Sequence, residues 1–238
     1  RVDDVDKLLN FEEMKGHTGI AHTRWATMGR PIDKNAHPFY SEAQNFSIVH
    51  NGIIENYETL KQVLISQGVS FTSDTDTEVL VQLISAFYYN DESLSFSDAV
   101  RAALQDIVGA YGIVAVCADE PETVVAARLG SPLVIGIGEG EYFLASDATP
   151  IVEYTRNVIY LDDGEMVELT ADNHVISEIN SKTILNKQLT EIDLSIEEIE
   201  KGEFSHFMLK EIHDQQHSIK DTMRGRLNFE DGITTLGG

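Results

Sequence analysis

Residues 112–147 read GIVAVCADEPETVVAARLGSPLVIGIGEGEYFLASD, and this stretch decides the fold class. It contains short apolar runs rich in Val, Ile and Ala, and the runs are separated by Gly, Pro or acidic residues. Runs of this length and composition predict β-strands joined by tight turns. The stretch therefore predicts neighbouring antiparallel strands rather than strands that alternate with helices.

Similar runs extend the strand prediction in both directions along the chain. We expect strands at 18–25 and 46–53, and further strands within 157–169 and at 174–179. Asp-Gly and Asp-Asn pairs between the later runs predict hairpin turns. The glycines of GIGEGEY, at 136–142, lie between two strands and not before a helix, which favours a hairpin over a dinucleotide-binding loop.

Helical periodicity is concentrated in two other blocks of the chain. Apolar residues at helical spacing predict helices within 56–68, 75–89 and 95–109, and again at 205–223. The third of these helices opens on Ser95, a favourable N-cap. Blocks of helices and blocks of antiparallel strands indicate an α+β layered fold.

The domain organisation is predicted to be simple. Residues 1–238 show no repeat and no low-complexity stretch, so we expect one domain, with residues 224–238 as the start of a linker to a further domain. The chain begins at Arg1 and not at Met, which suggests an internal piece of a longer polypeptide.

Charge and cysteine content exclude several classes of partner. The formal net charge is −23, which repels nucleic acid and anionic lipid headgroups. No apolar run approaches the ~20 residues that cross a bilayer. A single cysteine, Cys117, lies in a predicted buried strand, where an inert thiol in a reducing compartment is the favoured interpretation. We therefore expect a soluble cytoplasmic protein.

Two charged residues are candidates for binding a free amino acid. Arg24 lies in GIAHTRWATMG, residues 19–29, and has no obvious anion beside it in the sequence. Asp76 lies in SDTDTEV, where Ser73, Asp74 or Thr75 can cap a helix, so that Asp76 is left for another role. Together they could hold the carboxylate and ammonium groups of one ligand, or they could be two unrelated surface charges.

Asn51-Gly52 also has two interpretations. Asn-Gly after a strand is most often a hairpin turn, because both residues tolerate positive φ. A side-chain amide beside an unhindered backbone N–H could instead form an oxyanion hole. Spacing alone favours the turn. His213 and His217, one helical turn apart, are compatible with a metal, but without a third ligand an exposed polar face is favoured.

Three motifs in this order resemble the glutaminase domains of the glutamine:fructose-6-phosphate amidotransferases. They are GIAHTRWATMG, HNGIIENY and SDTDTEV, at 19–29, 50–57 and 73–79. The resemblance continues through GAYGIVAV, AARLGSPLVIGIG, FLASD and HFMLKEIHDQ, and so covers nearly the whole chain. It implies a four-layer αββα sandwich of the N-terminal-nucleophile hydrolase type, which agrees with the α+β prediction.

The resemblance also implies a role for each candidate residue. Arg24, with Thr27, would bind the α-carboxylate of L-glutamine, and Asp76 would bind its α-ammonium group. Asn51 and Gly52 would form the oxyanion hole, and Trp25 would gate the passage of ammonia. No metal or organic cofactor is implied. Fructose 6-phosphate would bind to a sugar-isomerase domain that this chain lacks, and the full-length enzyme would be a homodimer.

The chain departs from the family pattern at two places. Many members have histidine at the position of Met28. The family nucleophile is an N-terminal cysteine whose own amine acts as base, and this cysteine is not in the chain, because Cys117 belongs to a different motif. Two alternatives are a non-catalytic glutamine-binding regulatory domain and the glutaminase domain of an amidotransferase with a different acceptor.

Overall fold

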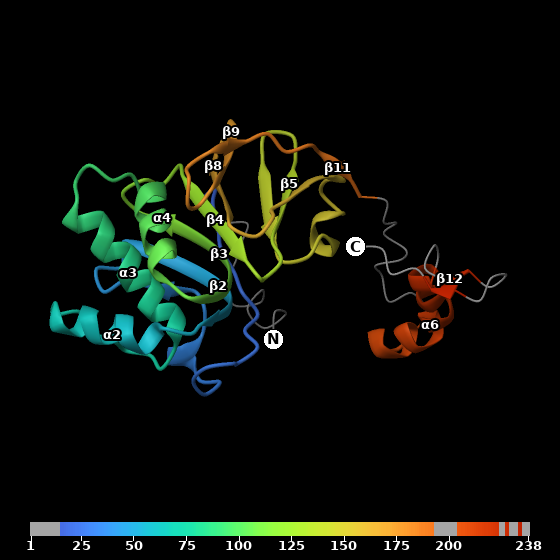
Figure 1. Ribbon diagram of the computed structural model, residues 1–238, viewed down its shortest axis with the longest axis horizontal. Coiled ribbons are helices and arrows are strands. Elements are labelled where there is room, and N and C mark those ends of the chain that lie inside the picture. The colour runs from blue at the N-terminus through green and yellow to red at the C-terminus, as the bar shows by residue number, and fades with distance from the viewer. Residues whose placement is uncertain (1–14, 193–203, 224–226, 229–232, 235–238) are drawn as a thin grey trace. The chain divides into compact units, whose positions relative to one another are not determined.

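The computed structural model describes residues 15–192, 204–223, 227–228 and 233–234. The chain divides into two units, residues 1–192 and 193–238, which are described separately below (Figure 1). Within the described part of the first unit the structure is α+β, as the sequence predicts, with helices α2–α4 and two antiparallel sheets.

The larger sheet of the first unit has seven antiparallel strands in the order β1-β2-β3-β4-β8-β9-β10. Its central strands are apolar over most of their length because both faces of the sheet are covered. The strands are β1 (Phe39–Tyr40), β2 (Phe46–Ile54), β3 (Gly109–Cys117), β4 (Val124–Leu129), β8 (Glu165–Thr170), β9 (Asn173–Glu178) and β10 (Ile184–Leu185).

The smaller sheet has four antiparallel strands in the order β11-β7-β5-β6. The predicted hairpin at 136–142 joins β5 to β6, where Gly138 N donates to Glu141 O at 2.9 Å. The strands are β5 (Val134–Ile137), β6 (Tyr142–Ala145), β7 (Asn157–Tyr160) and β11 (Thr190–Glu191).

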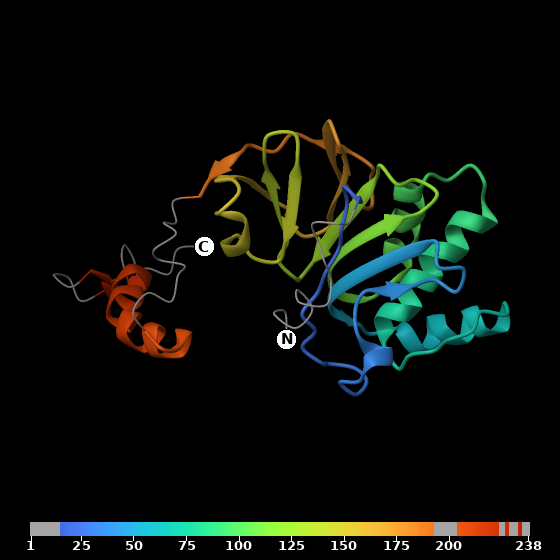
Figure 2. The same ribbon diagram turned by 180° about the vertical axis from the view of Figure 1, so that it is seen from behind.

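Helices α2 (Tyr57–Ser66), α3 (Asp76–Asn90) and α4 (Phe96–Asp106) cover one face of the larger sheet (Figures 1 and 2). α3 lies against β2, and its residues Asp76–Ile84 are all buried, since α2 and α4 pack on either side of it. The predicted cap of α4 is confirmed, because the Ser95 hydroxyl accepts a hydrogen bond from Asp98 N at 3.2 Å.

A second apolar core fills the space between the two sheets. Ala126 and Val167 of the larger sheet meet Ile135 and Ile159 of the smaller sheet, and each of these side chains is at most 2% exposed. Burial of each valine or isoleucine side chain contributes roughly 1.5–3 kcal/mol. The described part of the first unit therefore contains three layers of the expected sandwich, namely helices, the larger sheet and the smaller sheet.

The helix predicted at 205–223 is α6 (Phe207–Met223), in the second unit, where β12 (Leu227–Asn228) also pairs with β13 (Ile233–Thr234). These two strands are the described part of the predicted linker 224–238. On α6 the His213 ring stacks on Phe204, with 5.2 Å between ring centroids. The side chain of His217 lies outside the described residues.

One strand prediction and one hairpin prediction are wrong. Residues 18–25 form no strand, because their polar side chains bond to β2 and to a following turn rather than to a neighbouring strand. β7 and β8 form no hairpin, although Asp163-Gly164 lies between them, since β7 belongs to the smaller sheet and β8 to the larger one. Two short 3₁₀ helices, Asp33–Asn35 and Thr149–Ile151, complete the described elements of this unit.

None of the described helices combines the length and the apolar composition that crossing a membrane requires.

Candidate functional site

Asn51 and Gly52 lie inside strand β2 and not in a turn, so the turn favoured by their spacing is wrong. They stand opposite Gly112 and Tyr111 of β3. Gly52 has a φ of +129°, and a Cβ atom at this position would lie 2.0 Å from Ala110 O. The strand therefore requires glycine here, because any side chain would push β2 away from β3.

The backbone N–H of Gly52 points away from β3. Glu55 N donates to Val108 O at 2.8 Å on the β3 side, whereas Ile54 N donates to Asp76 Oδ2 at 2.8 Å on the other side. N–H groups of alternate residues in a strand share one edge, so Gly52 points to the same edge as Ile54. β1 covers this edge only at Ser47 and Ile48, within the described residues. Gly52 N–H is thus a donor without a strand partner there.

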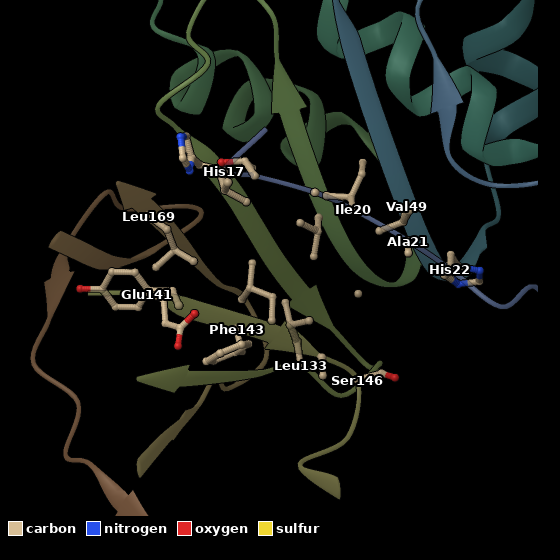
Figure 3. Close-up of a pocket in the computed structure, with 18 of the residues that line it drawn as sticks. His17, Ile20, Ala21, His22, Val49, Leu133, Glu141, Phe143, Ser146 and Leu169 are labelled. Atoms are coloured by element: carbon tan, nitrogen blue, oxygen red, sulfur yellow. The ribbon is translucent and has the colours of Figure 1, made fainter. Parts of the chain in front are cut away.

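The side chain of Asn51 is exposed and contacts His22. Asn51 Oδ1 lies 2.8 Å from His22 Nε2. Both residues line a cavity of about 710 Å³, whose apolar walls include Val114, Leu133 and Leu144. Figure 3 shows His22 at the opposite side of this cavity from Glu141 and Leu169. The cavity offers space for a small ligand directly beside the Asn51 amide.

Three histidines gather behind this edge of β2. The ring centroids of His22 and His37 are 4.2 Å apart, and those of His37 and Phe39 are 4.9 Å apart in a T-shaped contact. His50 Nδ1 lies 3.0 Å from Thr77 Oγ1 of α3. Sequence analysis did not identify this cluster, since the three residues are brought together only by tertiary structure.

The environment of the cluster disfavours positive charge. Burial lowers the pKa of His37 to about 3, with further lowering by the nearby His22, His50 and Arg24. Burial also lowers the pKa of His50, although the carboxylate of Asp76 opposes this shift. His37 is therefore uncharged at neutral pH, and it packs against His22 as a neutral aromatic ring.

Arg24 is held by the turn that follows it. Its guanidinium donates to the carbonyl oxygens of Met28, Gly29 (3.4 Å) and Arg30 (3.3 Å). No carboxylate forms an ion pair with Arg24 among the residues the structure describes. Carbonyl oxygens fix the direction of the guanidinium without neutralising it, so Arg24 remains available to an anion. Met28 contributes a backbone carbonyl here, which does not depend on its side chain.

Asp76 begins helix α3 and is more buried than the sequence suggested. Thr75 is the helix cap, since its hydroxyl accepts from Glu78 N at 3.3 Å. Asp76 is only 3% exposed, and its Oδ2 accepts the hydrogen bond from Ile54 N. Asp76 is therefore not a surface charge but a nearly buried carboxylate that also fixes the end of β2.

Asn35, which sequence analysis did not identify, links the Arg24 turn to the segment before α3. It is fully buried; its Nδ2 donates to Arg30 O at 3.0 Å, and its Oδ1 accepts from Asp74 N at 3.0 Å. Lys34 adds a partly exposed ion pair with Asp74, with 2.9 Å between Nζ and Oδ2. The backbone of Gly29 packs closely against the Asn35 side chain. A Cβ atom at Gly29 would lie only 2.8 Å from Asn35 Nδ2.

The predicted residues therefore fall into two connected groups. Asn51 and Gly52 are tied to Asp76 through Ile54, and Arg24 is tied to the segment before Asp76 through Asn35. Asn51 lines the cavity, whereas Arg24, Thr27 and Asp76 lie outside its lining. Trp25 is 90% exposed and Thr27 is also exposed.

Cys117 takes no part in the site. It lies at the end of β3, only 2% exposed, and burial raises the pKa of its thiol. Both features disfavour the thiolate, so the cysteine is an inert core residue, as its strand position predicts.

Comparison with known families agrees with the resemblance found in the sequence. Residues 6–218 match the glutamine amidotransferase domain family. The chain belongs to this family. The motifs around Arg24, Asn51 and Asp76 are all within the matched range, and the match continues into α6.

Among curated relatives, this glutamine amidotransferase domain is similar to proteins named glutamine–fructose-6-phosphate aminotransferase (isomerizing). The protein of Chlorobaculum tepidum is 52% identical over 100% of this chain and 39% of its own length. The protein of Bacteroides thetaiotaomicron is 46% identical over 97% of this chain and 37% of its own length. The chain thus spans less than two fifths of these relatives.

Solved structures of amidotransferases share the fold. Glutamine phosphoribosylpyrophosphate amidotransferase from B. subtilis has a TM-score of 0.56 and 26% identity, covering 68% of this chain and 35% of that one. A structure described as the allosteric regulatory enzyme of purine biosynthesis has a TM-score of 0.52, also at 26% identity, covering 63% of this chain and 32% of that one. These likenesses confirm the amidotransferase type of layered α+β fold.

Proposed function

We propose that this domain binds L-glutamine and releases ammonia from its side-chain amide, and that the full-length protein uses the ammonia to make glucosamine 6-phosphate from fructose 6-phosphate. The observation that carries the proposal is the 52% identity over 100% of the chain to a glutamine–fructose-6-phosphate aminotransferase. The geometry around β2 supports it, because two potential donors, the Asn51 amide and Gly52 N–H, are carried by neighbouring residues of this strand.

Substrate binding is assigned to the two groups of charged residues. Arg24, whose guanidinium is directed by three carbonyl oxygens, would bind the glutamine α-carboxylate with the help of Thr27. Asp76 would bind the α-ammonium group, and its small exposed fraction would strengthen this ion pair by excluding water. Binding both ends selects a free amino acid over a peptide.

The chemical step would take place beside Asn51. A cysteine thiolate, supplied by a segment outside this chain, attacks the amide carbon of glutamine, and the carbonyl oxygen becomes an oxyanion. Asn51 and Gly52 would donate hydrogen bonds to this oxygen, which stabilises the charge as it forms. When the tetrahedral intermediate collapses, the C–N bond breaks, the nitrogen takes a proton and leaves as ammonia, and water later hydrolyses the thioester to glutamate.

Partners and location are part of the same proposal. Trp25, 90% exposed beside Arg24, would gate ammonia on its way to a sugar-isomerase domain, where fructose 6-phosphate binds. The full-length protein is expected to be a cytoplasmic homodimer. The buried free thiol of Cys117 fits a reducing compartment.

The proposal is tested with the full-length protein. Glutamine and fructose 6-phosphate together should yield glutamate and glucosamine 6-phosphate in equal amounts. Formation of glutamate without any amino sugar, but with amination of another acceptor, would assign the domain to a different amidotransferase. Glutamine binding without hydrolysis would identify a regulatory domain instead.

A further inference from the structure

The direction of the Asn51 amide decides whether it can assist the proposed reaction. A side-chain amide presents an oxygen on one side and an NH₂ group on the other, and only the NH₂ group can donate to a developing oxyanion. Asn51 is exposed, so its own strand does not prevent the amide from turning over. Some other group must hold it in the productive direction.

His22 is the group in contact with the amide. Its Nε2 lies 2.8 Å from Asn51 Oδ1, a normal hydrogen-bond distance. Because an amide oxygen only accepts, Nε2 must carry the proton of this bond. The remaining side of the Asn51 amide, which is the NH₂ group, then faces away from His22.

The other ring nitrogen of His22 supports the same assignment. Nδ1 is buried and has no hydrogen-bond partner among the residues the structure describes. A buried N–H without a partner is less tolerable than a buried lone pair, so the proton is better placed on Nε2 than on Nδ1.

The ring of His22 is itself fixed from behind. It lies against the ring of His37, with 4.2 Å between centroids and a tilt of 32°, and His37 in turn makes a T-shaped contact with Phe39, which is 5% exposed in the core. Neither ring nitrogen of His37 has a partner among the described residues, so His37 supports His22 through ring contact rather than through a hydrogen bond. A rigid support is what a positioning residue requires.

We propose that His22 is a positioning residue that donates a hydrogen bond from Nε2 to Asn51 Oδ1 and thereby directs the Asn51 NH₂ group to the oxyanion of the glutaminase reaction. The inference rests on the proposed function, because it assigns a purpose to the direction of the amide. His22 touches neither substrate nor nucleophile in this assignment and acts only through Asn51.

The hydrogen bond can be tested in the 238-residue chain without any turnover. Nitrogen-15 NMR distinguishes a protonated ring nitrogen from one that carries a lone pair. We expect the Nε2 signal of His22 to be that of a protonated nitrogen, and we expect it to shift in Asn51→Ala. A His22 ring protonated only at Nδ1 would overturn the proposal, because the amide would then have to face the other way.

The catalytic consequence is tested by kinetics of the full-length protein with two matched variants. His22→Phe keeps the ring but removes the donor, and we expect kcat to fall about 10²-fold with KM for glutamine changed less than about threefold. His22→Gln restores a nitrogen donor at a similar distance from the backbone, and we expect kcat within about tenfold of the wild type. Equal kcat for His22→Phe and wild type would overturn the role.

A double-variant comparison separates positioning from general support of the fold. In the Asn51→Ala background, His22→Phe should lower kcat by less than about threefold, since the group that it positions is already absent. A further fall in kcat as large as that caused by His22→Phe in the wild type would show that His22 acts independently of Asn51. If His22→Phe does not fold, His22→Asn replaces it. The Asn side chain is too short for its amide nitrogen to reach Asn51 Oδ1, so kcat of His22→Asn is compared with kcat of His22→Gln.

The two levels of the proposal fail in different ways. A wild-type full-length protein without glutaminase activity would overturn the proposed function and the positioning role with it. An active wild type whose His22→Phe variant is equally active would overturn the positioning role alone.

Discussion

Asn35 Oδ1 accepts a hydrogen bond from the backbone N–H of Asp74 at 3.0 Å, and this contact joins the two segments that carry the charged residues of the site. Asn35 also donates to Arg30 O, one of the carbonyls that hold the Arg24 guanidinium. The buried amide thus connects the turn below Arg24 to the start of α3. The distance between the groups proposed to bind the two ends of glutamine depends on this connection.

Asn35→Ala should therefore weaken glutamine binding as well as the fold. The substitution leaves Arg30 O and Asp74 N–H without their buried partner, and we expect a loss of about 1–3 kcal/mol of unfolding free energy. Arg24 would be less firmly placed, so glutamine affinity measured by calorimetry should fall about tenfold, or about 1.4 kcal/mol.

Arg101→Met is a matched control for this prediction. Arg101 is 8% exposed and bonds α4 to Ser177 Oγ at 2.9 Å and to backbone carbonyls after it, away from the site residues. The Arg101→Met substitution should lower the free energy of unfolding and leave glutamine affinity unchanged. If both variants affect binding equally, Asn35 supports only the fold.

Arg24→Ala should reduce glutamine affinity more than any other single change in the turn. It removes charge-assisted hydrogen bonds of roughly 1.5–3 kcal/mol, or about 10- to 150-fold in dissociation constant. Arg24→Lys should retain little of the glutamine affinity. The lysine ammonium lacks the planar fork of a guanidinium, which can bond to the carbonyls of the turn and to a carboxylate at the same time. An unchanged dissociation constant for the alanine variant, measured by calorimetry, would discard the role.

Asp76→Asn should discriminate between ligands. The amide oxygen of Asn can still accept from Ile54 N, so the contact at the end of β2 is preserved. We expect glutamine to bind at least tenfold more weakly, whereas glutaramate, which lacks the α-amino group, should lose much less. Competition binding with both ligands measures this difference. Equal losses for both would mean that Asp76 acts only on the backbone.

Local sequence pattern predicted most helices and strands but not which sheet each strand joins. The Ser95 cap and the β5–β6 hairpin depend on neighbouring residues, and they were found where expected. The cap of α3 is Thr75, one of the three candidates that the sequence offered. Within 157–169 both strands form, but the predicted hairpin does not, because β7 pairs with β5 and β8 pairs with β4. Asp163, between them, accepts from Gly130 N at 2.8 Å. These pairings and this contact involve residues outside 157–169, so the pattern within this run could not predict them.

The candidate site shows the same limit. Arg24, Asn51 and Asp76 were identified from motifs that resemble a known family, yet the residues that hold them were not. Asn35 and His22 act across 39 and 29 positions of sequence, respectively. A buried Asn and an imidazole of this kind look ordinary in the sequence, since only the fold shows what they contact.

The histidine cluster should make stability sensitive to pH. The folded-state pKa of His37 is lowered to about 3 from its ordinary value of 6.5, chiefly by burial. Between these values the unfolded chain binds a proton that the folded chain does not, so stability should fall as pH decreases from 6.5 toward 3. The slope from one such group is at most about 1.4 kcal/mol per pH unit, and His50, whose pKa is also lowered, adds to it.

Urea unfolding at several pH values between 5 and 8 tests this expectation. His37→Phe keeps an aromatic ring beside His22 and Phe39 but cannot titrate, so its stability should depend less steeply on pH. At pH 8 the difference between variant and wild type reports packing alone. Identical slopes for the two proteins would show that His37 does not contribute to the pH dependence.

Asn51 provides the test that separates chemistry from binding. If its amide donates to the oxyanion, Asn51→Ala in the full-length protein should lower kcat by about 10²–10³-fold, because that bond strengthens only as charge appears. The glutamine dissociation constant should change little, since Arg24 and Asp76 still hold the amino-acid end. Steady-state kinetics and calorimetry on the same preparation measure both quantities.

Asn51→Asp is the informative partner of this variant, because it keeps the size of the side chain and an oxygen that accepts from His22 Nε2, which lies 2.8 Å from Oδ1 in the structure. It replaces the NH₂ group with a negative oxygen, which repels an oxyanion. We therefore expect Asn51→Asp to lose at least as much kcat as Asn51→Ala while it remains folded. An active Asn51→Asp protein would show that the contact with His22, rather than a donor to the substrate, is what Asn51 supplies.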